Sequence, residues 1–406
     1  MKSMKKIVFV SSGWLFNDPR YFYFIKSYLK RGYRVTAVNL IFNTKRFNAT
    51  KLPQRWQDLQ NQSLEKSFQY KVININFLKN TYFWTIFQRF FSLHLVLYYY
   101  RASYLFKELA ELIKSADLIH GAEFCYGSVL SCHIAQKYQK PFVFDVKEYN
   151  FDLSHRKSYT RFARFIEKRL INNASVMPCV SPGIMSQYQK EYPEDKNKFT
   201  FLPNAVSLHE TLNTIQPKSG KIKCILSCSF LPELKGIERF IELWERITPA
   251  EACLDLRLFG LNSKQKNKLI KLAEKTYNIS LFIIPPVTEE ELVISLYDYD
   301  IGIIPYLPDS GFNYQESCPN KFGQYVSAGL GIISTNLNYV SAEVTKNNLG
   351  AIYNPNDLET ARQNIAQYFS NKLYVYQTGK NSLDYFQHIF NFEYYSKDYF
   401  EKLTKL

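Results

Sequence analysis

The chain has 406 residues, of which 46% are hydrophobic and 17% aromatic, so it can form two domains with their own cores and is too apolar for a disordered chain. Its formal net charge is +15, and the N-terminal half carries this excess, because residues 1–200 hold 31 Lys and Arg against 14 Asp and Glu. This asymmetry favours an anionic partner, such as a membrane surface, a phosphorylated lipid or nucleic acid, and simple solubility is the alternative interpretation.

The cysteines and the N-terminus indicate a cellular compartment. None of the seven cysteines belongs to a CxxC pair, and most fall in apolar runs, which is typical of buried free thiols in a reducing cytoplasm. The N-terminus lacks the apolar region and cleavage site of a signal peptide, and no apolar run reaches the roughly 18 residues of a spanning helix. We therefore expect a cytoplasmic protein that is at most peripheral on the inner face of a membrane.

The chain begins with a predicted βαβ unit. Residues 7–12 and 35–40 are apolar strands, and residues 21–31 between them have helical periodicity. Gly13 would let a backbone approach a ligand closely, while Arg20 could hold an acceptor anion or form an ion pair at the helix start. The motif GxGxxG is absent, which argues against a nicotinamide-binding site.

Residues 79–107 are rich in aromatic and basic side chains. At helical spacing this segment could be an interfacial helix with its aromatics in a membrane surface, or a helix that packs in the core. Stacking on nucleic acid ranks behind both, because no RNA- or DNA-binding motif accompanies the aromatics. We therefore expect no nucleic-acid partner.

Two further predicted strands, residues 117–121 and 141–146, each lead into an acidic turn. Glu123 and Glu148 follow these strands and are polar candidates for a ligand site. Each could equally be an ordinary acid at a helix N-terminus. His120 lies inside its strand-like run, which favours a packed core histidine over a catalytic one.

After a polar stretch at residues 209–221, the α/β alternation starts again. Lys235-Gly236 follows the first strand of this second half, and Val287 follows the third. Asp298-Tyr299-Asp300 spells the DxD motif of metal-dependent sugar transferases with a different fold. Because it spans a helix end and a strand start, we assign it no metal.

The stretch from residue 300 to residue 335 has the pattern strand, loop, helix, strand. Lys321 lies in the first turn of the predicted helix, where the helix dipole disfavours a cation, so a nearby anion would explain it. Glu316 precedes this helix, and Gln324 lies one turn beyond Lys321 on the same face. A carboxylate, an ammonium and an amide on one surface suit a ligand with phosphates and hydroxyls. An N-terminal acid and a solvated lysine are the alternative interpretation.

Several of these motifs resemble those of retaining glycosyltransferases of family 4 (glycosyl transferases group 1), which have the GT-B fold. Glu316 and Gln324 stand where the family carries two glutamates separated by seven residues. Pro319-Asn320-Lys321 and residues 325–333 are similar to the family variant that continues EYMAAGKPVI. Further matches are Asp18-Pro19-Arg20 with the DPR opening, Leu202-Pro203-Asn204 with the IPNGV hinge, and Lys235-Gly236 with the GRLxxxKG turn.

The resemblance implies an α/β protein of two Rossmann-like doubly wound domains that face a cleft. Residues 1–206 would form the acceptor-side domain, residues 207–390 the donor-binding domain, and residues 391–406 a helix that crosses back. The implied reaction is transfer of a hexose from a nucleotide-sugar donor to a glycan or lipid-linked acceptor, with retention and without a metal or other cofactor. Cell-surface polysaccharide or lipopolysaccharide biosynthesis is the implied setting.

The resemblance also implies roles for individual residues. Catalytic roles fall on Glu316, which would orient the donor sugar, and on Lys321 and Lys235, which would stabilise the leaving diphosphate. Further donor contacts fall on Gln324 at the ribose and on Ser317, Cys318, Asn320, Gly236, Val287 and Asn204. The acceptor-side residues are Gly13, Arg20, Glu123 and Glu148.

The sequence also departs from the family pattern. Gln324 brings no charge to the ribose, and Phe230 replaces the arginine of the GRLxxxKG turn. Ala122 and Lys147 stand where the family carries a histidine in each of two motifs, so neither Ala122 nor Lys147 can serve as a histidine base. These departures keep open a non-catalytic nucleotide-sugar-binding or partner protein on a GT-B scaffold. A nucleotide-sugar epimerase is a third interpretation, which would require a general acid/base set.

Overall fold

The computed structural model describes residues 5–12, 15–16, 18–41, 53–62, 67–74, 106–151, 157–208, 214–216, 218–229, 234–247, 251–259, 263–276, 278–283 and 289–406. The chain divides into two compact units. Unit 1 comprises Met1–Val180, Ile184–Leu202 and Lys397–Leu406, and unit 2 comprises Ser181–Gly183 and Pro203–Ser396. The limits drawn from the sequence alone lie at residues 206 and 390.

Unit 1 is built on a parallel sheet with the strand order β3-β2-β1-β4-β5. The central strand β1 is buried on both faces, as is typical of a parallel sheet covered on each side by helices. A parallel pair, β6 and β7, continues beside β5 through the bridge between Val143 and Val176. The strands are β1 (Lys6–Ser12), β2 (Arg34–Ile41), β3 (Phe68–Asn74), β4 (Leu118–Gly121), β5 (Phe142–Phe144), β6 (Met177–Cys179) and β7 (Phe199–Phe201).

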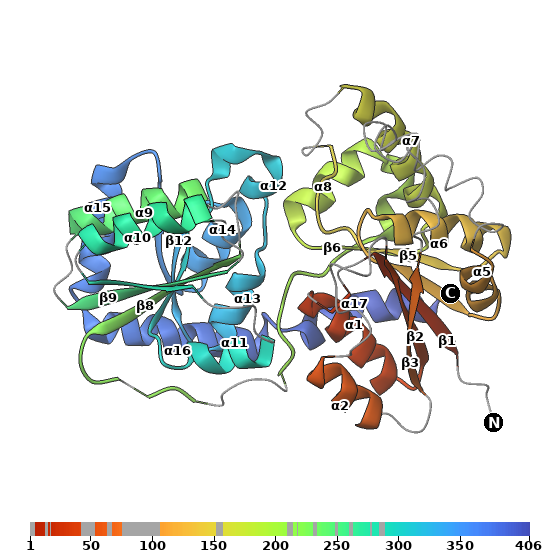
Figure 1. Cartoon of the computed structure of the whole chain (residues 1–406), viewed down its shortest axis with the longest axis horizontal. Helices are drawn as coiled ribbons and strands as arrows, with labels where there is room; N and C mark the ends of the chain where they lie inside the picture. The colour runs from red at the N-terminus through yellow and green to blue at the C-terminus, as the bar shows by residue number, and fades with distance from the viewer. Residues whose placement is uncertain are drawn as a thin grey trace. The chain divides into compact units, whose positions relative to one another are not determined.

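Helices cover both faces of this sheet (Figure 1). One face carries α1 (Pro19–Lys30), α2 (Gln54–Gln62) and the C-terminal helix α17 (Phe392–Thr404), and the other carries α5 (Lys107–Lys114), α6 (Tyr126–Lys137) and α7 (Lys157–Asn173). Beyond them lie α8 (Pro182–Glu191) and the 3-10 helix η2 (Pro193–Lys198). Asp18 caps α1 by accepting from the backbone N–H of Arg20 at 2.9 Å.

The end of the chain is fixed to unit 1 through a buried tyrosine pair. The hydroxyl of Tyr28 in α1 hydrogen-bonds the hydroxyl of Tyr399 in α17 and lies 2.9 Å from Nδ1 of His120. His120 is fully buried, as expected of a core histidine. Burial lowers its pKa well below the usual value for histidine, so its ring is neutral at physiological pH.

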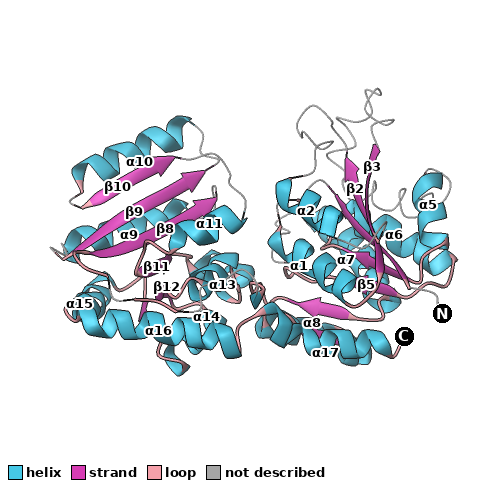
Figure 2. Cartoon of the chain, turned by 90° about the horizontal axis from the view of Figure 1, so that it is seen from below, coloured by secondary structure: helices cyan, strands magenta, loops and turns pink. Residues whose placement is uncertain are grey.

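Unit 2 contains a second parallel sheet, with the strand order β10-β9-β8-β11-β12-β13. Figure 2 shows these strands fanned by the twist of the sheet. The two doubly wound sheets confirm the predicted α/β fold class. The strands are β8 (Ile222–Ser229), β9 (Ala252–Phe259), β10 (Ile279–Ile283), β11 (Ile301–Ile304), β12 (Gly331–Thr335) and β13 (Gly350–Tyr353).

The helices of unit 2 also form two layers. In Figure 1, α9 (Leu234–Ile247), α10 (Ser263–Lys275) and α15 (Leu358–Phe369) lie on one face, and α11 (Glu289–Leu296), α13 (Asn320–Ser327) and α16 (Lys372–His388) lie on the other. The remaining helical elements are η4 (Pro308–Ser310), α12 (Phe312–Gln315) and α14 (Asn338–Lys346). Pro319 is the N-cap of α13, so Lys321 lies in the first turn of this helix, as predicted.

The structure describes the side chains of six of the seven cysteines. Six cysteines are free thiols, of which Cys132, Cys179, Cys224 and Cys318 are buried while Cys125 and Cys253 are half-buried. Among the described residues, no helix combines the length and apolar character needed to cross a membrane.

A buried carboxyl in unit 1 connects α7 to the turn after β5. Glu167 has no exposed surface and accepts hydrogen bonds from the Tyr188 hydroxyl at 2.5 Å and from the side-chain amide of Asn150 at 2.6 Å. Burial raises its pKa to about 7, although these hydrogen bonds oppose the shift. Because the folded pKa exceeds the unfolded one, folding is favoured most below the unfolded pKa, and this contribution is lost as pH rises through about 7.

We predict that Glu167→Gln removes this pH dependence. The free energy of unfolding of the unmodified chain should fall by about 3 kcal/mol more than that of the variant between about pH 4.5 and pH 8. Urea unfolding of the full chain at several pH values measures the difference. Glu194→Gln, at an exposed carboxyl in η2, is the matched control, and parallel pH profiles for Glu167→Gln and the unmodified chain would contradict the prediction.

Candidate active site

The predicted donor-site residues of unit 2 lie where parallel strands end. Glu316 is the C-cap of α12, between β11 and β12, and its side chain is half-buried. Its Oε1 accepts a hydrogen bond from Nδ2 of Asn338 at 2.5 Å. Asn338 is the first residue of α14, directly after β12, so the next strand end orients the carboxylate.

Lys321 is the second residue of α13, and only 9% of its surface is exposed. Its Nζ donates to the Tyr306 hydroxyl at 3.0 Å and lies 5.0 Å from the centroid of that ring. Tyr306 follows β11, so a residue near the end of one strand holds the ammonium of the next helix. No motif in the sequence indicated this contact.

The remaining polar positions of this stretch surround the start of α13. Asn320 and Ser317 are half-buried, and Gln324 is 8% exposed one turn into the helix. The carbonyl of the buried Cys318 accepts from Nδ2 of Asn204 at 2.9 Å. The Oδ1 atom of Asn204 is buried and has no hydrogen-bond partner among the described residues. Asn204 therefore joins the predicted hinge to the loop that carries Glu316.

Gly236 lies in the first turn of α9 and is packed against the loop after β11. A Cβ atom at this position would be 1.9 Å from the Pro305 carbonyl oxygen, so no larger residue fits without movement of the helix. Lys235 is the adjacent residue of α9, but its side chain, like Val287, Phe230 and residues 79–105, lies outside the described part of the chain.

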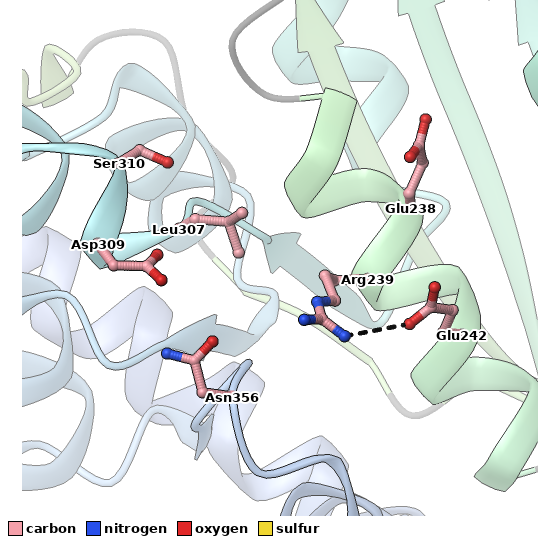
Figure 3. Close-up of a pocket in the computed structure, with 7 residues that line it drawn as sticks. All are labelled: Glu238, Arg239, Glu242, Leu307, Asp309, Ser310 and Asn356. Atoms are coloured by element: carbon pink, nitrogen blue, oxygen red, sulfur yellow. Dashed lines mark hydrogen bonds and ion pairs between the residues drawn. The ribbon is translucent and has the colours of Figure 1, made fainter.

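A polar pocket of about 420 Å³ adjoins the contact between Gly236 and the loop after β11. Figure 3 shows side chains from α9 and from the loops after β11 and β13 around it. Its carboxylates and amide accept hydrogen bonds from hydroxyl groups, whereas its acidic lining disfavours phosphate. No motif in the sequence indicated this pocket. Its lining residues are Glu238, Arg239, Glu242, Leu307, Asp309, Ser310 and Asn356.

Within the DxD motif, Asp300 and the central Tyr299 make contacts inside unit 2. The Asp300 carboxylate accepts from the backbone N–H of Lys223 at 2.8 Å, and the Tyr299 hydroxyl donates to Asp255 at 2.7 Å. No group of three or more metal-ligating side chains gathers in the described residues.

In unit 1, Arg20 is not available for an acceptor anion. It is 2% exposed, and its guanidinium forms a fork on the buried Asp145 carboxylate, with Nη2 and Oδ1 2.8 Å apart. Its Nη1 donates to the Leu202 carbonyl at 2.7 Å. The proposal of an acceptor contact at Arg20 is therefore corrected, because burial of a charge requires this internal partner. The ion-pair alternative describes the arrangement.

Glu123 is part of an ion cluster with the residue that replaces a family histidine. Lys147 pairs with Asp18 and lies with its Nζ 3.5 Å from Glu123 Oε2. Burial raises the pKa of Glu123 despite the attraction of Lys147. Burial lowers the pKa of Lys147, but Asp18 and Glu123 outweigh this effect and hold it above the usual range. Lys147 is therefore a cation that joins three strand-end loops.

These groups border a small pocket of about 110 Å³ in unit 1. Glu123 and the exposed Glu148 both line it, so two of the predicted acceptor-side residues come together. Asn150, which bonds Glu167, lines it as well. Gly13 lies outside the described residues.

Comparison with known families gives a direct match. Residues 20–210 match the model of Glycosyltransferase Family 4. The resemblance to this family is confirmed. No curated protein sequence matches the chain, so the remaining comparisons are structural.

Solved glycosyltransferase structures share the whole fold. The sucrose-phosphate synthase of Thermosynechococcus elongatus has 12% identity over 99% of this chain and 98% of its own, with a TM-score of 0.68. Anabaena HepE in complex with UDP-glucose has 11% identity over 99% of this chain and 100% of its own, with a TM-score of 0.65. WaaG, a glycosyltransferase involved in lipopolysaccharide biosynthesis, has 15% identity over 98% of both chains, with a TM-score of 0.57. The chain thus has the GT-B fold.

The corrected role of Arg20 leads to a stability prediction. Arg20→Ala and Asp145→Ala should each lower the free energy of unfolding by about 3 to 5 kcal/mol, because each leaves a buried charge without its partner. The double variant Arg20→Met with Asp145→Leu should lower the free energy of unfolding less than either single change, because no buried charge is left. Urea unfolding measures all three, with Arg34→Ala at an exposed position of β2 as the control. Unchanged stability in Arg20→Ala would restore a ligand-binding role.

Proposed function

We propose that this GT-B protein, which resembles glycosyltransferase family 4, transfers a hexose from a nucleotide-sugar donor to a glycan or lipid-linked acceptor. The reaction proceeds with retention and without a metal, in cell-surface polysaccharide or lipopolysaccharide biosynthesis. The observation that supports this proposal best is the group at the strand ends of unit 2, where Glu316 and Lys321 are held by Asn338 and Tyr306.

In this proposal the donor binds along the carboxyl edge of the unit 2 sheet. Lys321, Lys235 and the backbone N–H groups at the start of α13 meet the diphosphate, where negative charge develops as the glycosidic bond breaks. Glu316 accepts hydrogen bonds from hydroxyls of the sugar, and Gln324 contacts the ribose. Asn320, Ser317, Cys318, Gly236, Val287 and Asn204 complete the donor contacts.

The choice of donor and acceptor rests on the structural relatives. Because HepE was solved with UDP-glucose and with UDP, uridine diphosphate sugars are the first donors to test. We assign the acceptor to unit 1 beside Glu123 and Glu148. The basic charge of the N-terminal half supports a cytoplasmic protein that binds peripherally to an anionic membrane carrying a lipid-linked acceptor.

Incubation of the full chain with labelled uridine diphosphate sugars tests this function. Slow hydrolysis of a donor without acceptor supports an enzyme. Binding without turnover supports the alternative of a nucleotide-sugar-binding protein, which Gln324 and Phe230 favour because they replace charged family residues. Neither binding nor turnover with any nucleotide sugar would overturn the proposal.

We predict that Lys321→Ala and Lys235→Ala each lower kcat by about 100-fold or more while the fold stays intact. Each removes a cation positioned at the leaving diphosphate. Turnover of the donor and the circular dichroism of each variant are the measurements, with Lys346→Ala in the last turn of α14 as the control. Near-native rates in both site variants with every accepted donor would place the donor site elsewhere.

A second functional prediction concerns metals. Treatment with a chelator should leave turnover unchanged, because lysines and helix N-termini meet the phosphates in place of a carboxylate-bound cation. Activity is measured before and after EDTA and after addition of magnesium or manganese. Loss of turnover in EDTA that either ion restores would contradict metal independence.

A further inference from the structure

Tyr306 contacts Lys321 in two ways. Its hydroxyl accepts a hydrogen bond from Nζ at 3.0 Å, and its ring centroid lies 5.0 Å from the same atom. A hydroxyl and an aromatic face both attract an ammonium, the ring through its quadrupole. The Lys321 side chain is buried, whereas Tyr306 is half-buried, so the tyrosine reaches from the interior to the surface at this position.

Tyr306 is itself fixed from three directions. Its backbone carbonyl accepts from the Thr335 hydroxyl at the end of β12. Its ring packs nearly edge-on against Tyr314, with the two centroids 6.0 Å apart. The preceding residue, Pro305, packs closely against Gly236. A Cβ atom at position 236 would be 1.9 Å from the Pro305 carbonyl oxygen. The hydroxyl of Tyr306 therefore has a defined position relative to α9 and α13.

The contact with Tyr306 restricts the Lys321 side chain before a ligand binds. A lysine side chain carries about 2 kcal/mol of rotamer entropy, much of which is lost when a ligand immobilises its ammonium. A partner that already restricts the ammonium reduces this loss. An ammonium has three N–H donors, so the bond to Tyr306 is compatible with further bonds to phosphate oxygens. Because Tyr306 is neutral, it orients Lys321 without cancelling its charge.

We propose that Tyr306 is a positioning residue that fixes the ammonium of Lys321 for the diphosphate of the donor. This inference rests on the proposed function of Lys321 and extends it to a residue that the sequence analysis did not identify. Tyr306 does not touch the reacting atoms in this proposal. Its effect on turnover must therefore pass through Lys321, and this dependence is what an experiment can measure.

The test is a double-mutant cycle on the full chain with Tyr306→Phe, Lys321→Ala and the double variant. Tyr306→Phe keeps the ring and removes only the hydroxyl, so we expect kcat to fall about tenfold, or about 1.4 kcal/mol, with KM changed less than about twofold. In the Lys321→Ala background the same change should have no further effect. If the hydroxyl contributed only to structure, its removal would lower kcat by the same factor in the native and the Lys321→Ala backgrounds.

Binding of UDP, measured by calorimetry, gives a second readout that does not need turnover. Tyr306→Phe should weaken UDP binding by about threefold in the native background and not in the Lys321→Ala background. Tyr353→Phe is the matched control, because the Tyr353 hydroxyl is buried and has no hydrogen-bond partner among the described residues. We expect this control to match the unmodified chain in kcat and UDP binding.

The outcomes separate this inference from the function on which it rests. Equal effects of Tyr306→Phe in both backgrounds, or no effect in either, would overturn the positioning role while Lys321→Ala still shows its own loss. If Lys321→Ala binds UDP and turns over donor like the unmodified chain, the proposed donor site fails and the role of Tyr306 fails with it.

Discussion

The close contact between Gly236 and the Pro305 carbonyl sets the geometry of the candidate donor site. It brings the start of α9 directly onto the loop that follows β11, because a side chain at position 236 would collide with the carbonyl oxygen. Tyr306 is the next residue of that loop, and it holds Lys321 at the start of α13. One glycine thus places the start of α9 against the loop whose next residue holds Lys321.

The same sheet architecture produces a different electrostatic result in unit 1. Its strand ends also carry charged residues, but these pair with one another. Arg20 is bound to Asp145 in the interior, and Lys147 lies between Asp18 and Glu123. Removing Arg20, Asp145 or Lys147 leaves a partly or fully buried charge without this partner, so these residues hold the loops of unit 1 together. The basic excess of this half must therefore be sought among its other lysines and arginines.

The sequence predicted the elements better than the contacts between them. Runs such as residues 7–10 and 301–304 contain only apolar residues and glycine, as strands buried on both faces require, and their assignment needed only local information. The pairing of Arg20 with Asp145 joins residues 125 positions apart, and it depends on which strands are neighbours in the sheet. Local patterns do not contain that information, so the charge of Arg20 was assigned to a ligand.

Arg20 and Lys321 show how similar sequence signals lead to different contacts in the folded chain. Both are cations in the first turn of a helix, where the dipole disfavours them. Asp145 compensates Arg20 with a full negative charge, whereas Tyr306 offers Lys321 only a dipole and a ring. A neutral partner restricts the position of a cation and preserves its attraction for an anion. A carboxylate partner neutralises the charge of the cation and so weakens this attraction. The identity of the contacting side chain, more than the position of the cation in its helix, therefore underlies our proposal that Lys321, unlike Arg20, meets a diphosphate.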